Sequence, residues 1–211
     1  MEPLIEALTA FLREAKLDGI EFDWEFPKGK REWALFSKFL VNLKQRLMQD
    51  GRILAVALAD WGVHLSPEAV RAIDQLSYMA YDINDINGYH ASFGRAAVRA
   101  VEYAEKCGFR REQINLGLPY YGRPTYKGEY WPLWKDARWA IGRIMPRKSL
   151  FDGIEMDAYY NCPGMVADKT AFALQMGLGG VMIFPLNADR PHGNPLCLTD
   201  AIRRTIEERV E

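Results

Sequence analysis

The chain has 211 residues, of which 49% are hydrophobic and 26% charged, a composition typical of a soluble globular domain with one sizeable core. Its 27 basic and 28 acidic residues give a formal net charge of -1, so charge provides no reason to expect nucleic acid or an anionic membrane as partner. No apolar run approaches the roughly 20 residues of a membrane span. The first residues lack the features of a signal peptide, and the sequence does not indicate a cellular compartment.

Segments whose apolar residues recur at helical spacing alternate with short continuous apolar runs along the chain. This alternation is the pattern of βα units around a parallel sheet. Apolar spacing predicts helices over residues 4–15, 36–47, 93–107, 165–176 and 202–210, and a short helix that Ser66-Pro67 begins. The runs between them predict five strands: IEFDWEF, ILAVALA, QLSYMAY, INLGLPYY and VMIF. We therefore expect a single α/β domain over residues 1–211, with about five parallel strands.

An aromatic-rich segment over residues 122–164 interrupts this alternation, and we interpret it as an insertion within the domain. Loops of this length are usually functional. One helix is expected between Trp134 and Met145. Trp131 and Trp134 are the aromatic residues best suited to stack on a polysaccharide, although packing is an equally good interpretation of the aromatics in this segment.

Cysteine and histidine residues give no sign of a metal site or a disulfide framework. They are few and widely spaced: Cys107, Cys162 and Cys197, and His64, His90 and His192. We interpret the cysteines as structural and the histidines as solvated or locally hydrogen-bonded. No metal and no cofactor are predicted.

Three acidic residues, Glu21, Asp23 and Glu25, alternate along the first expected strand. Successive side chains of a strand face opposite sides, so all three project to one side. A carboxyl group beside another carboxylate has a raised pKa, which suits a general acid working near neutral pH. Parallel barrels place their chemistry at the carboxyl ends of strands. The pattern therefore predicts Glu25 as a proton donor, and the alternative is a solvent-exposed acidic edge strand.

The segment DGIEFDWEFP resembles the D-G-x-D-x-D-W-E-Y-P signature of family 18 chitinases, with Glu21 at a position where the family usually has Asp. Three later segments resemble family motifs in the same order. LSYMAYD is similar to M-x-Y-D, and INLGLPYYGR is similar to L-G-x-P-F-Y-G-R. GLGGVMIF is similar to G-L-G-G-V-M-I-W, with Phe184 in place of the tryptophan. The resemblance covers about residues 1 to 190.

The resemblance implies a TIM-type (β/α)8 barrel, of which this chain would carry the later strands, starting at the helix before the fourth strand. The first three strands would have no counterpart. An open five-stranded sheet exposes two edges and an apolar inner face. We therefore expect an open or rearranged partial barrel, or a homo-oligomer in which a second chain completes the barrel.

The resemblance also implies a retaining, substrate-assisted hydrolysis of β-1,4-linked N-acetylglucosamine. Glu25 would protonate the glycosidic oxygen while the 2-acetamido carbonyl of the sugar attacks its anomeric carbon. Asp23, tuned by Glu21, would stabilise the resulting positive ring, and Tyr81 would hold the acetamido oxygen. The expected substrate contacts are Met79, Asp82, Tyr121, Arg123, Trp131 and Phe184. An alternative role for Tyr121 is packing in the barrel core. An alternative role for Arg123 is a structural ion pair.

Several functions stay open at this point. The chain could hydrolyse chitin or its oligosaccharides, or act as an endo-β-N-acetylglucosaminidase on N-glycan cores. It could instead be a catalytically impaired carbohydrate-binding protein, because part of the pocket would be missing. A conventional two-carboxylate glycosidase would need a second inward carboxylate, for which Asp82 is the candidate.

Overall fold

The structure, a computed structural model, describes residues 1–60, 62–124, 131–137, 146–151 and 154–210. Its central sheet has five parallel strands in the order β1-β2-β3-β4-β8. The strands are β1 Gly19–Phe22, β2 Ile53–Leu58, β3 Gln75–Tyr78, β4 Ile114–Pro119 and β8 Gly180–Phe184. The predicted α/β class with five parallel strands is therefore confirmed.

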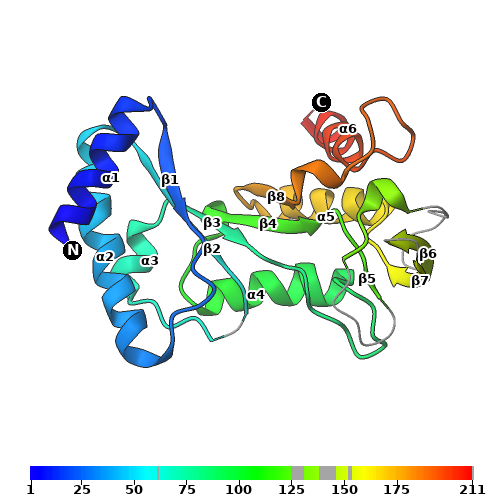
Figure 1. The fold of residues 1–211 in the computed structure, drawn as a ribbon, viewed down its shortest axis with the longest axis horizontal. Coiled ribbons are helices and arrows are strands. Elements are labelled where there is room, and N and C mark those ends of the chain that lie inside the picture. The colour runs from blue at the N-terminus through cyan, green and yellow to red at the C-terminus, as the bar shows by residue number, and fades with distance from the viewer. Residues whose placement is uncertain (61, 125–130, 138–145, 152–153, 211) are drawn as a thin grey trace.

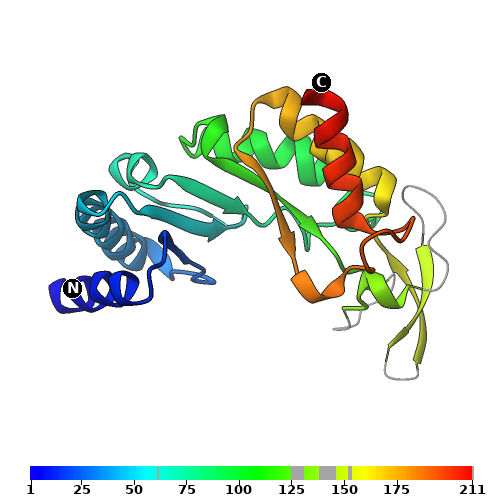
Figure 2. The ribbon, with the colours of Figure 1, turned by 90° about the horizontal axis from the view of Figure 1, so that it is seen from above.

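The five-stranded sheet is open, with β1 and β8 as its two edges. Figure 2 shows the strands following one another from the N-terminal end of the molecule to the C-terminal end, without β8 returning to β1. The expected open partial barrel is thus confirmed for the described part of the chain. Completion of the barrel by a second copy stays a prediction, and light scattering that gives the mass of one chain would contradict it.

Helices flank the sheet along its length (Figure 1). α1 and α2 lie at the β1 end, and α5 and α6 lie at the β8 end, so the two termini are at opposite ends of the molecule. The helices are α1 Glu2–Glu14, α2 Gly29–Gln49, α3 Pro67–Ala72, α4 Arg99–Lys106, α5 Pro163–Met176 and α6 Leu198–Val210. The helix expected over residues 93–107 begins as a π-helical segment, Gly94–Val98, which continues into α4. None of the described helices combines the length and apolarity needed to cross a membrane.

α2 shows how the sequence pattern builds the core. Its buried side chains recur every three or four residues and so form one face: Trp33, Phe36, Leu40, Leu43 and Leu47. This face packs toward β2, where Leu54 and Val56 are fully buried. The next helix, α3, begins as predicted, because the Ser66 hydroxyl accepts a hydrogen bond from the Ala69 N–H at 3.2 Å.

A second, antiparallel sheet lies within the segment 122–164, in the order β5-β7-β6. Its strands are β5 Arg123–Pro124, β6 Pro146–Phe151 and β7 Ile154–Tyr159. Of the helix expected between Trp134 and Met145, the structure describes one 3-10 turn, Trp134–Asp136, and residues 138–145 lie outside the described part. Arg123 pairs with Tyr159, so this sheet holds the arginine beside the end of β4.

Gly117 on β4 allows the close approach of β3, and we expect its replacement to be strongly destabilising. A Cβ atom at Gly117 would lie 2.4 Å from the Tyr78 carbonyl oxygen and 3.0 Å from the Tyr81 ring. Because the first contact is with backbone, the two strands would have to move apart. Gly117→Ala should lower the free energy of unfolding by about 1–3 kcal/mol or more, as measured by urea denaturation.

Gly94 provides the matched control, because a Cβ atom added there would meet no atom within 4 Å among the described residues outside its own helical turn. Its φ is not in the left-handed region. Gly94→Ala should leave the free energy of unfolding unchanged or raise it by about 0.4–1 kcal/mol. Equal stability of the two variants would contradict the close approach at Gly117.

Candidate active site

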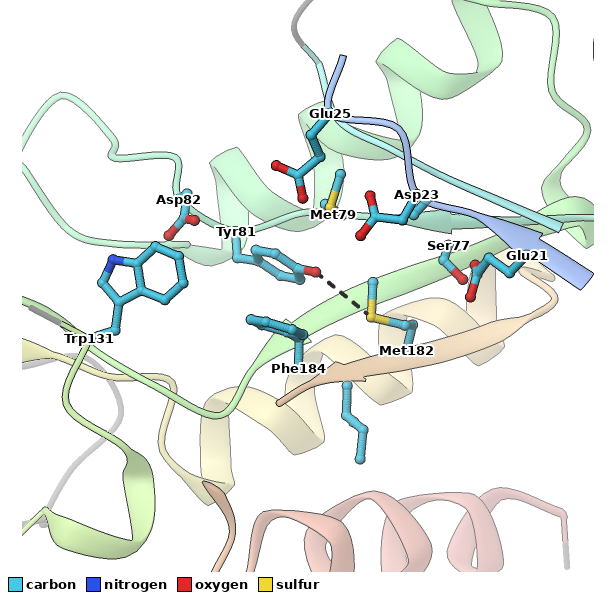
Figure 3. Close-up of a pocket in the computed structure, with 12 residues that line it drawn as sticks. Glu21, Asp23, Glu25, Ser77, Met79, Tyr81, Asp82, Trp131, Met182 and Phe184 are labelled. Carbon is cyan, nitrogen blue, oxygen red and sulfur yellow. Dashed lines mark hydrogen bonds between the residues drawn. The ribbon is translucent and has the colours of Figure 1, made fainter. Parts of the chain in front are cut away.

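A cavity of about 310 Å³ lies over the carboxyl-terminal part of the parallel strands (Figure 3). Its walls come from β1, β2, β3 and β8, from the segments that follow β1 and β3, and from Trp131. The lining residues are Glu21, Asp23, Glu25, Ala57, Ser77, Met79, Tyr81, Asp82, Trp131, Met182, Ile183 and Phe184. The structure therefore brings together the site residues predicted from sequence except Tyr121 and Arg123, which lie behind Asp82, and Trp134. Trp134 is 1% exposed and its Nε1 donates to the Leu196 carbonyl oxygen at 2.7 Å, so packing is its role and stacking on a sugar is not.

The three predicted acidic residues occupy one side of the pocket, in a row that faces Tyr81 in Figure 3. The strand that carries them is shorter than expected. β1 ends at Phe22, because its ladder with β2 ends at the pair Phe22 and Val56. Asp23 and Glu25 follow the strand, yet their side chains continue the alternation into the pocket.

The apolar residues between these acids turn the other way. Phe22 and Phe26 pack against the core, and the Trp24 ring contacts Phe36 with ring centroids 5.4 Å apart. Trp24 nevertheless stays 42% exposed, because β1 is an edge strand.

Glu25 has the electrostatic environment of a general acid. Although Glu25 is exposed, partial loss of solvent around its carboxyl group raises its pKa, and the negative charges of Asp23 and Asp82 raise that pKa further. A raised pKa keeps the proton on Glu25 to higher pH than on an ordinary glutamate. The carboxyl group can therefore deliver a proton to a group bound in the pocket.

Tyr81 and Phe184 form the aromatic side of the pocket. Their rings stack at a centroid distance of 5.9 Å and an interplanar angle of 19°. Phe184 is 41% exposed and so offers a face to a ligand. Burial raises the pKa of Tyr81, so its hydroxyl stays protonated and able to donate; in the structure it points to Met182 Sδ at 4.0 Å.

Asp82 accepts hydrogen bonds from Tyr121 and Arg123, two residues that the sequence analysis expected to contact the substrate. Its Oδ1 accepts hydrogen bonds from the Tyr121 hydroxyl at 2.7 Å and from Arg123 Nε at 2.6 Å. Burial acts to raise the pKa of this carboxyl group, but the hydrogen bonds from Arg123 and Tyr121 and the positive charge of Arg123 outweigh burial and hold the pKa at about 2. Asp82 is therefore ionised at neutral pH.

Tyr121 and Arg123 also support Trp131. The Tyr121 ring stacks on the Trp131 ring at 5.7 Å and 27°, and the Arg123 guanidinium carbon lies 4.5 Å from the Trp131 ring centroid. Tyr121 is 1% exposed. Both residues thus contact the pocket wall from behind, whereas Trp131 itself is 44% exposed and lines the pocket.

Sequence reasoning missed Ser77, Met182 and His90. Ser77 and Met182 line the pocket, and strand alternation could have found them, because they lie two residues before Met79 and Phe184. His90 is 1% exposed, and its Nε2 accepts a hydrogen bond from the Asp82 backbone N–H at 3.0 Å. His90 lies eight residues after Asp82, and no feature of the sequence between them indicates that the two residues are in contact. In the part of the chain that the structure describes, no group of three or more His, Cys, Asp or Glu residues is placed to hold a metal ion.

The family model for glycosyl hydrolases family 18 matches residues 2–189. Probable chitinase 2 of Drosophila melanogaster is 22% identical over an alignment of 257 positions, gaps included, which covers 90% of this chain and 51% of that protein. Chitotriosidase-1 of Mus musculus is 24% identical over an alignment of 246 positions, which covers 89% of this chain and 53% of that protein. The chain thus spans about half the length of these relatives.

Solved structures show the same fold. The family 18 chitinase from the chitin utilization locus of Flavobacterium johnsoniae matches with a TM-score of 0.78 and 23% identity, covering 98% of this chain and 66% of that one. The Cycas revoluta family 18 chitinase in complex with (GlcNAc)3 matches with a TM-score of 0.74 and 17% identity, covering 98% of this chain and 72% of that one.

Proposed function

This chain belongs to glycosyl hydrolase family 18, and from that premise we propose that its pocket hydrolyses β-1,4-linked N-acetylglucosamine, as found in chitin and chitooligosaccharides. The observation that carries the proposal is the position of Glu25: a carboxyl group with a raised pKa in a cavity that also contains Asp23, Tyr81 and Phe184. The relatives named as chitinases and the chitooligosaccharide complex of the Cycas revoluta enzyme support this substrate class.

In the proposed reaction Glu25 donates its proton to the glycosidic oxygen, and the bond from this oxygen to the anomeric carbon breaks. The 2-acetamido carbonyl oxygen of the same sugar forms a bond to the anomeric carbon, as in the substrate-assisted mechanism of this family. Asp23 stabilises the positive ring through the acetamido N–H, and the Tyr81 hydroxyl donates to the acetamido oxygen. Water then attacks the anomeric carbon and gives a proton to the Glu25 carboxylate, while the bond between the anomeric carbon and the acetamido oxygen breaks. This step restores the enzyme and the acetamido group and releases the sugar with retained configuration.

The proposed contacts to the sugar chain follow from the pocket walls. Phe184 and Trp131 present exposed aromatic faces on which sugar rings can stack. The bonds from Tyr121 and Arg123 both end on Asp82 Oδ1, so we assign Oδ2 to a polar group of the substrate. Tyr121 and Arg123 would then act on the sugar through Asp82 and Trp131.

Hydrolysis of two fluorogenic disaccharides tests this function. We expect release of the fluorophore from a chitobioside and no measurable release from the matching cellobioside, which has a hydroxyl in place of the acetamido group. Equal turnover of both would contradict substrate assistance and favour a two-carboxylate mechanism with Asp82. Release of a glycan from an N-glycosylated protein would identify an endo-β-N-acetylglucosaminidase instead of a chitinase.

A second candidate, a carbohydrate-binding protein with impaired catalysis, is favoured by the open sheet. Glu21, Asp23 and Glu25 are all exposed in the described structure, since β1 is an edge strand. An exposed site gives less stabilisation to the charges that develop in the transition state. Calorimetric binding of chitotetraose without any turnover would support this candidate.

The pH dependence of turnover should respond to Asp23. Glu25 must be protonated to act, so activity falls as the pH rises through its pKa. Because the charge of Asp23 raises that pKa, Asp23→Asn should move the alkaline limb of the residual kcat/KM profile to lower pH. Titration of the Glu25 carboxyl group by 13C NMR should show the same shift.

Glu21→Gln is the matched control, since Glu21 lines the same pocket but is not among the charges that raise the pKa of Glu25. We expect a smaller displacement of the alkaline limb for this variant. An unchanged limb in Asp23→Asn, or an equal shift in both variants, would argue against the assigned coupling.

A further inference from the structure

Lys169 on α5 is a fully buried amine outside the lining of the pocket. Its Nζ donates hydrogen bonds to the Ala91 carbonyl oxygen at 2.8 Å and to Asn161 Oδ1 at 2.5 Å. Burial lowers its pKa to about 7. Both the charged and the neutral amine have at least two N–H groups, so either form can make the two bonds.

Asn161 extends the same network to the turn at residues 90–91. Its Nδ2 lies 3.4 Å from the His90 carbonyl oxygen and 3.3 Å from the Ala91 carbonyl oxygen. Ala91 has a φ of 49°, which lies in the left-handed region that residues with a Cβ rarely adopt. Lys169 and Asn161 therefore supply the contacts that compensate a strained turn.

The His90–Ala91 turn is connected to Asp82 by a hydrogen bond. The imidazole of His90 is fully buried, and its Nε2 accepts a hydrogen bond from the Asp82 backbone N–H at 3.0 Å. Asp82 also has a left-handed backbone, with a φ of 57°. This backbone conformation directs its carboxylate to Tyr121, Arg123 and the pocket.

We propose that Lys169 and Asn161 are positioning residues for the active site: they clamp the His90–Ala91 turn, and the clamped imidazole holds Asp82 in the conformation that points its carboxylate into the pocket. This inference rests on the proposed function, which assigns Asp82 to the substrate. It adds two residues that touch no substrate and lie outside the pocket wall.

The position of Asp82 also has a consequence for Glu25. The charged groups that act on Glu25 are Asp23 and Asp82, in a pocket that also contains Glu21 and Tyr81. If Asp82 moves away, the pKa of Glu25 falls. A loosened clamp should thus change both substrate binding and the pH at which Glu25 loses its proton, whereas a lysine that serves packing alone should change neither.

Lys169→Met tests the inference, because methionine retains an unbranched apolar side chain and removes the N–H donors. We expect KM for a chitooligosaccharide to rise about tenfold, the effect of losing one hydrogen bond in the network, and the NMR-detected pKa of Glu25 to fall. In an Asp82→Asn background the same substitution should have no further effect on either quantity. Asn161→Ser should act in the same direction, and it decides the matter if Lys169→Met does not fold.

Thr170→Val is the matched control, because Thr170 is buried next to Lys169 and its hydroxyl donates to the Val166 carbonyl of its own helix, its only hydrogen bond among the described residues. It should lower thermal stability and leave KM and the pKa of Glu25 unchanged. The inference is overturned if Lys169→Met and Asn161→Ser behave like this control, or if Lys169→Met has its full effect without the Asp82 carboxylate. If the wild type neither binds nor cleaves the oligosaccharide, the proposed function fails, while the Glu25 titration still tests the clamp without substrate.

Discussion

Glu25→Gln should lower kcat/KM for chitotetraose, whose leaving group is a sugar, by about 100-fold to 10,000-fold, the range that a positioned general acid contributes. Glutamine has the size of glutamate but no acidic proton. The leaving sugar would therefore have to depart as an alkoxide or take its proton from water. Binding of chitotetraose, measured by calorimetry, should persist, because Phe184, Trp131 and Asp82 are unchanged.

The fold should tolerate this substitution. Partial loss of solvent and the nearby charges of Asp23 and Asp82 already disfavour the ionised form of Glu25, as its raised pKa shows, so a neutral amide fits the site. The melting temperature should be equal to or above that of the wild type. Glu21→Gln makes the same chemical change elsewhere in the pocket and should lower kcat/KM much less, because Glu21 would act only through Asp23. A Glu25→Gln variant with half the wild-type rate would exclude Glu25 as proton donor.

Asp82→Asn should weaken both the fold and the binding of substrate. The substitution removes the charge that pairs with Arg123 and leaves a guanidinium group that is only 23% exposed without its partner. Removing one partner of such a pair lowers the free energy of unfolding by about 1–3 kcal/mol. KM should rise, because the carboxylate assigned to the substrate is lost and Trp131 loses part of its support through Arg123.

The stability effect should depend on pH in a defined direction. The pKa of Asp82 is about 2 in the folded chain, against about 3.9 for an unfolded aspartate. A lowered pKa means that ionised Asp82 contributes stability above about pH 4, and that this contribution is lost as the pH falls toward 2. Urea denaturation should therefore show the full difference between wild type and variant at pH 6 and a smaller one at pH 3.

Asp50→Asn is the comparison for this effect. Asp50 pairs with Arg13, whose side chain is 55% exposed, and exposed ion pairs contribute little to stability. We expect a smaller loss at pH 6 than for Asp82→Asn. A difference between wild type and Asp82→Asn that stays constant from pH 6 to pH 3 would contradict the lowered pKa of Asp82.

The sequence by itself determined the elements of the fold and one wall of the site, because these depend on local spacing. The stripe of apolar residues in α2 and the cap at Ser66 determine their helices. The two-residue spacing of Glu21, Asp23 and Glu25 determines that they share one side. The resemblance to the family assigns Tyr81 and Phe184 to the same pocket as these acids, in agreement with parallel strands that bring their carboxyl ends to one edge of the sheet.

Only the tertiary structure decided where each element ends and which side chains stand behind the pocket. β1 ends at Phe22 because a strand persists only while it has a ladder partner, and that depends on β2. Tyr121 and Arg123 contact Asp82 from about 40 residues away, and Lys169 reaches the 90–91 turn across 78 residues. Such contacts form between segments that packing alone brings together, and no periodicity within a segment encodes them.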